Sequence, residues 1–136
     1  MKEGVTQFTC HFESGSAPTE PEGAELQRWR REMFIRDAVG CNMDRYGACY
    51  GNMSVRTGAY AAAPGRREFL VSCTQTGGDE APGTEALARV THYDHRRNSV
   101  RAIGPCAPSS EALTHGAIYD ADLTIRAVTH GHDAHL

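Results

Sequence analysis

The chain has 136 residues, which is enough for one domain with a hydrophobic core and too few for two. Its 40% hydrophobic and 23% charged residues are typical of a soluble globular protein and argue against wholesale disorder. Fourteen Lys and Arg residues against seventeen Asp and Glu residues give a formal net charge of −3, so the chain as a whole has no positive field for nucleic acid.

Targeting signals and cysteine spacing indicate the compartment in which a protein resides. The first residues contain no uninterrupted apolar run and no small-residue cleavage pattern, so we expect no signal peptide. No stretch of the sequence reaches transmembrane length. The five cysteines are odd in number and include no CxxC pair, which predicts neither a disulfide framework nor a cysteine-type zinc site. We therefore expect a cytoplasmic protein that binds neither membrane nor nucleic acid.

Two regions are expected along the chain. Residues 1–23 are rich in Gly, Ser, Pro and Glu, which predicts an irregular N-terminal arm with little core contact. The domain itself is expected to occupy residues 24–136. It begins with a helix from Ala24 to about Val39, because apolar side chains recur at spacings of three and four. The predicted buried stripe of this helix includes Leu26, Trp29 and Met33.

The rest of the domain is expected to alternate strands with one more helix. Short segments rich in β-forming residues predict strands at 48–55, 68–73, 89–93 and 99–103. A second helix is expected to open at Glu111, and residues 124–130 then return as a strand. This order predicts a mixed α/β fold with a mostly antiparallel sheet.

The sequence His130-Gly131-His132 lies at the end of the last predicted strand. Residues two apart project to the same face of a strand, so the two imidazoles can reach one metal ion, and zinc readily accepts such nitrogen ligands. A chain with seven histidines also produces an HxH pattern by chance, and solvated terminal histidines are the alternative interpretation.

The sequence Ser109-Ser110-Glu111 lies at the predicted start of the second helix. Unpaired backbone N–H groups and the helix dipole favour an anion such as phosphate there. The alternative is that a serine merely caps the helix and Glu111 is a favourable acid in its first turn.

Two glycine-containing segments are further candidates for ligand contacts. Residues 74–78 read Thr-Gln-Thr-Gly-Gly, in which glycines let backbone amides approach an anion closely, although a simple turn explains them as well. Residues 51–56 read Gly-Asn-Met-Ser-Val-Arg, which suits either a strand bulge or a ligand contact.

Together and in this order, the four segments resemble the class II aldolase and adducin head-domain family, in which GNxSxR, a TxTG-like loop, SSE and HxH recur along the chain. The resemblance covers roughly residues 26–136. It implies a three-layer α/β/α domain with a mostly antiparallel central sheet, of which the C-terminal part is missing here. It also implies a homo-oligomer, commonly a tetramer.

The resemblance assigns roles to individual residues. By that resemblance, His130 and His132 are two of three histidine ligands of Zn²⁺ or another divalent metal, and Glu111 is the catalytic proton-transfer group. The positions that match substrate phosphate ligands are Asn52, Thr76, Gly77, Ser109 and Ser110.

The family's third histidine lies well downstream of the HxH pair, so we expect this chain to be truncated and a poor catalyst. Nothing in the sequence supports His92, His95 or His135 as a replacement. His115 is the best remaining candidate, because it lies one helical turn after Glu111 on the same face.

The implied activity is that of a metal-dependent, aldolase-like lyase. It would cleave or rearrange a small phosphorylated or carboxylated sugar-like substrate through a zinc-stabilised enediolate. Aldol cleavage, epimerisation, dehydration and decarboxylation all occur in the family, and the motifs do not separate them. The alternative is a non-catalytic, adducin-like module for protein association.

Overall fold

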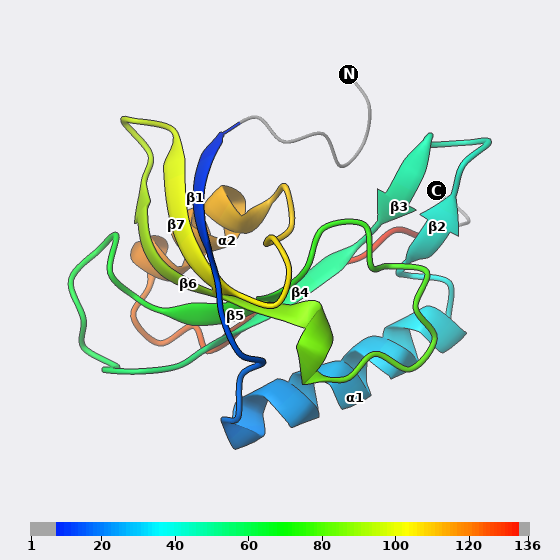
Figure 1. Ribbon diagram of the computed structural model, residues 1–136, viewed down its shortest axis with the longest axis horizontal. Coiled ribbons are helices and arrows are strands. Elements are labelled where there is room, and N and C mark those ends of the chain that lie inside the picture. Colours follow the sequence, from blue (N-terminus) through cyan, green and yellow to red (C-terminus); the bar gives the residue numbers. More distant parts are fainter. Residues whose placement is uncertain (1–7, 134–136) are drawn as a thin grey trace.

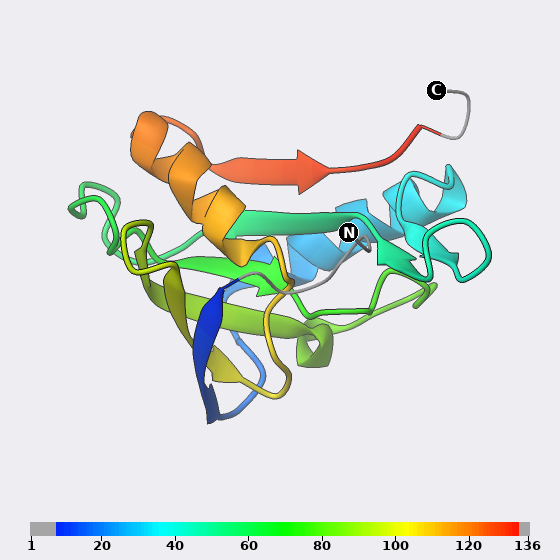
Figure 2. The ribbon, with the colours of Figure 1, turned by 90° about the horizontal axis from the view of Figure 1, so that it is seen from above.

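The computed structural model describes residues 8–133, which contain a six-stranded sheet, a two-stranded sheet and two α-helices (Figure 1). The spatial order of the large sheet is β1-β7-β6-β5-β4-β8. Its strands are β1 Thr9–Ser14, β7 Ser99–Gly104, β6 Leu87–Asp94, β5 Phe69–Ser72, β4 Asn52–Arg56 and β8 Ala127–His130. Only the β1–β7 pair is parallel, which confirms the prediction of a mixed α/β fold with a mostly antiparallel sheet. Figure 2 shows β1 and β8 at opposite edges.

The two α-helices, α1 Pro21–Ile35 and α2 Ala112–Ala121, pack against opposite faces of the sheet (Figure 1). Strand β5 shows this arrangement, because its successive side chains alternate between the two faces. Phe69 packs in a cluster with Tyr119 of α2, whereas Leu70 packs in a second cluster with Leu26 of α1. Neither helix has the length and apolar composition that a bilayer crossing requires, and the described residues contain no other α-helix.

The small sheet pairs β2 Gly40–Asn42 with β3 Ala48–Tyr50, and a 3₁₀ helix at Thr84–Ala86 precedes β6. In the register of this hairpin Cys41 lies directly opposite Cys49, and the two form a disulfide. A second disulfide joins Cys73 to Cys106, and Cys10 is free. The prediction that the cysteines form no disulfide framework is therefore wrong. The bonded pairs are 8 and 33 residues apart, and chain folding alone brings them together.

The segment expected to be an irregular arm is also more ordered than predicted. Strand β1 pairs with β7 along six residues, and α1 begins at Pro21, inside the supposed arm. Residues 1–7 lie outside the described part of the chain. Leu26 and Met33 of the predicted stripe face the core, as expected. Trp29 does not, because it is 55% exposed while Gln27 and Arg30 are buried.

Candidate functional site

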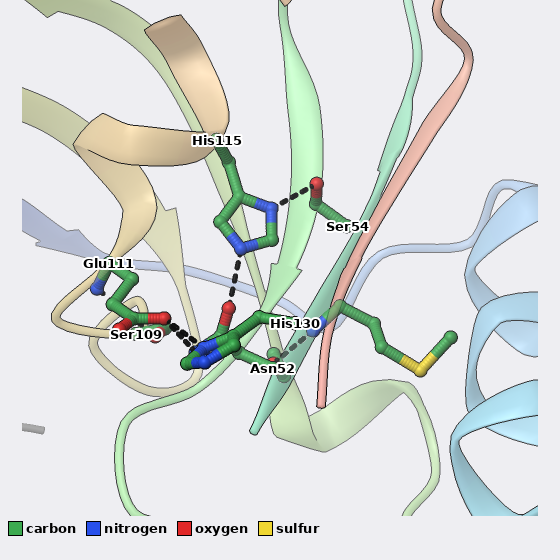
Figure 3. Close-up of polar contacts among 8 residues, drawn as sticks. Asn52, Ser54, Ser109, Glu111, His115 and His130 are labelled. Carbon is green, nitrogen blue, oxygen red and sulfur yellow. Dashed lines mark hydrogen bonds and ion pairs between the residues drawn. The ribbon is translucent and has the colours of Figure 1, made fainter. Parts of the chain in front are cut away.

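Three elements bring the predicted site residues together at one end of the sheet. Asn52 at the start of β4 lies opposite His130 at the end of β8 in the antiparallel register. Glu111 is the N-cap residue of α2, and its side chain points toward both (Figure 3). The strand pairing and the helix start thus place an amide, an imidazole and a carboxylate within hydrogen-bond distance.

The carboxylate of Glu111 is the centre of this cluster. Its Oε2 accepts hydrogen bonds from Asn52 Nδ2, at 2.7 Å, and from Nδ1 of His130. The hydrogen bond with His130 is the main cause that lowers the pKa of Glu111, with a smaller contribution from Asn52, while partial burial acts in the opposite direction. Because an ionised carboxylate only accepts, the proton of the His130–Glu111 contact is on Nδ1 of the imidazole. In a neutral His130 ring, Nε2 then carries the lone pair that a metal would use.

A buried chain of hydrogen bonds supports Asn52 from the core. The Oδ1 of Asn52 contacts Nε2 of His115, whose Nδ1 lies 2.6 Å from Ser54 Oγ (Figure 3). Ser54 Oγ in turn lies 2.7 Å from the hydroxyl of Tyr119. Burial lowers the pKa of His115 from 6.5 to about 4, against the opposing effect of Glu111, so the ring is neutral near pH 7.

The donors of this chain follow from the acceptor-only oxygen of Asn52. Nε2 of His115 must donate to it, so Nδ1 of the neutral ring accepts from the hydroxyl of Ser54. Ser54 then accepts from the hydroxyl of Tyr119, whose pKa burial raises to about 12. With the amide of Asn52 donating to Glu111, each polar group in the chain has one defined role.

A small pocket next to this cluster contains five of the six predicted catalytic and substrate-binding residues. Its lining includes Asn52, Gly77, Ser109, Ser110 and Glu111. The cavity volume is about 20 Å³, which is room for about one water molecule. Ser109 is 5% exposed, and its hydroxyl accepts the backbone N–H of Glu111. This bond lies before the first turn of α2, whose N-cap Glu111 makes no side-chain cap hydrogen bond, so the capping role considered for the serines is not found.

The sixth predicted residue, Thr76, does not line this pocket. Its hydroxyl donates to the carbonyl of Cys73 at 2.7 Å and accepts from Nη2 of Arg30 at 2.8 Å. Arg30 also contacts the carbonyl oxygen of Thr76, so a buried side chain of α1 anchors the loop. A Cβ at Gly77 would lie 2.6 Å from the carbonyl oxygen of Gly40 and 2.7 Å from that of Tyr50, so this position requires glycine.

The imidazole rings of His130 and His132 have centroids 5.0 Å apart, as expected for an HxH pair with its side chains on one side of the chain. The ring of His132 packs against Tyr46 and Tyr50, at centroid distances of 5.0 and 4.9 Å. No group of three or more His, Cys, Asp or Glu side chains within residues 8–133 is arranged to hold a metal ion. His115 is a poor third ligand, because both of its nitrogens contact core partners and the residue is 1% exposed.

A comparison with protein families decides the assignment. The family model described as Class II Aldolase and Adducin N-terminal domain matches residues 42–136. The chain belongs to this family. The matched region of this aldolase and adducin domain contains the whole cluster of Asn52, Glu111 and His130, whereas β1 and α1 lie before it. No curated protein and no solved structure shows a significant match to the chain.

Several residues that shape the site of this aldolase and adducin domain were not predicted to do so. Ser54 shares a strand face with Asn52, since residues two apart project alike, and that periodicity was the available signal. His115 was considered only as a metal ligand, although it serves as a buried hydrogen-bond partner. Arg30 had no signal in the sequence, because a charged residue on a helix is normally solvated.

Proposed function

We propose that this domain handles the substrate in a metal-dependent, aldolase-like lyase acting on a small phosphorylated or carboxylated sugar-like molecule. The observation that carries the proposal is the convergence of Asn52, Glu111 and His130 beside the pocket lined by Ser110. A carboxylate, an imidazole and hydrogen-bond donors around a small cavity form the kind of polar set that proton-transfer chemistry needs.

The same residues fit a divalent metal in part. His130 and His132 offer the nitrogen donors that zinc prefers, and Glu111 orients His130 through Nδ1, as carboxylates commonly do for metal-binding histidines. We propose that these two histidines hold Zn²⁺ or another divalent metal. When bound, the metal would supply a Lewis acid for negative charge that develops on the substrate oxygens.

The remaining steps belong to the chain's own residues. We propose that Ser110 and the backbone around Gly77 bind the anionic group of the substrate, with Thr76 acting indirectly by holding the loop in place. Asn52 orients the carboxylate of Glu111 by donating to Oε2, and this carboxylate accepts or returns the proton that moves on the substrate. The lowered pKa keeps the carboxylate ionised near neutral pH.

A non-catalytic, adducin-like module for protein association is the second candidate. The specific observation in its favour is that the family model matching residues 42–136 describes adducin domains as well as aldolases. An interaction module needs no metal and no ionised Glu111.

Zinc binding distinguishes the two candidates. We expect the purified chain to bind zinc weakly at a single site, measured by calorimetry, because only two histidine ligands are supplied. His130→Ala should abolish this binding, while the matched control His92→Ala, an exposed histidine on β6, should leave it unchanged. Zinc binding that His130→Ala leaves intact would contradict the assigned site. A chain that binds no zinc but binds a protein partner stoichiometrically would support the adducin-like module.

The same resemblance supports two proposals about architecture. The contacts of α1 and α2 with opposite faces of the sheet support a three-layer α/β/α domain. We also propose a homo-tetramer, which light scattering coupled to gel filtration tests directly. A cytoplasmic location stays a prediction, and the two disulfides weigh against it, because reducing compartments rarely preserve them.

A further inference from the structure

Strands β1, β7 and β6 run side by side at one edge of the large sheet (Figure 1). Residues of these strands line a second cleft, separate from the pocket described above. Its volume is about 490 Å³, within the range of small-molecule sites. The walls come from these three strands and from residues 64–66. It shares no lining residue with the pocket around Glu111.

Three basic side chains lie in one row across the floor of this cleft. His11 of β1 lies beside Arg101 of β7 in the parallel register, and Arg101 lies beside His92 of β6 in the antiparallel register. Val100 and Ala102 pack in the core cluster that contains α2 residues, so Arg101 between them faces the opposite side of the sheet. An irregularity in β6 between Val90 and His92 shifts the register and brings His92 next to Arg101.

The charges of the cleft are unbalanced. Three arginines line it, Arg66, Arg97 and Arg101, and Asp94 is the only acidic residue in the lining. Asp94 is engaged by the backbone amide of Arg97 and lies 3.9 Å from its guanidinium. Arg66 and Arg101 form no ion pair or side-chain hydrogen bond with any described residue. A chain with a net charge of −3 thus concentrates unpaired positive charge in one concave site.

We propose that this cleft binds the phosphate group of a small phosphorylated molecule, with Arg101 as its main ligand and His11 and His92 on either side. The planar guanidinium forms two parallel hydrogen bonds with a phosphate, which favours phosphate over a simple monovalent anion. The volume of about 490 Å³ matches a small molecule, whereas a polymeric anion requires an extended positive surface. Strand β1 supplies His11 and lies outside the residues that match the family, so the site goes beyond the proposed lyase function.

Nuclear magnetic resonance of the ¹⁵N-labelled full chain tests this proposal. Glycerol phosphate and inorganic phosphate are titrated separately while the backbone amides of His11, His92 and Arg101 are followed. We expect saturable shifts at these amides and tighter binding of glycerol phosphate than of inorganic phosphate. Arg101→Gln should weaken the binding at least tenfold, because a charged hydrogen-bond donor is lost.

Two further variants serve as controls. Arg28→Gln removes the same charge from an exposed residue of α1, whose side chain pairs with Glu25, and should leave the affinity unchanged. Arg101→Lys keeps the charge without the planar fork and should give an intermediate affinity. Circular dichroism confirms that each variant is folded.

Several results would overturn the proposal. Amide shifts that are confined to residues 109–111 and unchanged by Arg101→Gln would instead show binding at the pocket of the proposed lyase. Equal affinity for inorganic phosphate and glycerol phosphate would show a bare anion site. Binding of heparin that depends on Arg101, without saturable binding of glycerol phosphate, would show a polyanion surface. Zinc binding at His130 is measured independently, so either proposal can fail without the other.

Discussion

His115→Leu tests the buried chain of hydrogen bonds behind the site. Leucine has a similar volume, so the main effect is to leave the Oδ1 of Asn52 without a donor and the hydroxyl of Ser54 without an acceptor. Each unsatisfied buried group costs about 1–3 kcal/mol, so we expect the free energy of unfolding to fall by about 2–4 kcal/mol. Urea unfolding at pH 7.5, followed by circular dichroism, measures this loss.

A double-mutant cycle with Ser54→Ala separates this chain from a general packing defect. Ser54→Ala removes the partner of His115 and the acceptor of the Tyr119 hydroxyl, so it alone should also cost about 2–4 kcal/mol. Because both changes break the same hydrogen bond, the double variant should lose about 1–2 kcal/mol less than the sum of the two single losses. Losses that add to within about 0.5 kcal/mol would refute the proposed connection.

The pH dependence of stability gives an independent measurement on the same residue. The unfolded chain takes up a proton at His115 near pH 6.5, whereas the folded chain takes it up only near pH 4. Stability should therefore fall as the pH is lowered from about 7 to about 4, by about 3 kcal/mol in total from this residue, with no further loss from it at lower pH. His115→Leu should remove most of this slope. An unchanged slope would mean that another group titrates in that range.

Two other predictions concern the loops around the site. Gly77→Ala should lower the free energy of unfolding by about 1–3 kcal/mol, because the new Cβ meets two backbone oxygens. The control Gly83→Ala should cost less, because its nearest neighbours belong to the flexible side chain of Glu85. Equal losses of stability in thermal unfolding would contradict this prediction. For the disulfides, thiol labelling of the denatured, unreduced chain should modify one of the five cysteines, and labelling after reduction should modify all five. Modification of five cysteines before reduction would show that Cys41–Cys49 and Cys73–Cys106 are not bonded in the purified protein.

The parts of the fold that follow from local patterns were predictable. Segments rich in β-forming residues around Leu70 and Val90 identified the central strands, and the last strand was expected to end at His130, where it does end. The helix start at Glu111 was likewise expected from its serines. These predictions succeed because strand alternation and helix starts depend on neighbouring residues, and they place the SSE and HxH motifs on the correct elements.

The parts that depend on distant segments were not predictable in the same way. Strand β1 is stabilised by pairing with β7, about ninety residues later in the sequence, and nothing within residues 9–14 announces that partner. Arg30 and Gln27 lie on the buried face of α1 because their polar ends reach the carbonyl oxygens of Thr76 and Gly83. A pattern of hydrophobic residues predicts that polar Gln27 and Arg30 face solvent and that apolar Trp29 faces the core. Both expectations are wrong, because Gln27 and Arg30 are buried and Trp29 is exposed.

The orientation of the Asn52 amide connects the core to the chemistry proposed for Glu111. If the amide were reversed, its oxygen would face the carboxylate of Glu111 and its NH₂ group would face the donor Nε2 of His115, so that two acceptors and two donors would oppose each other. The buried chain from Tyr119 therefore keeps the NH₂ group on Glu111, where it stabilises the ionised form together with His130. Because a module for protein association needs no carboxylate oriented by donors from the core, we take this arrangement as support for the proposed lyase.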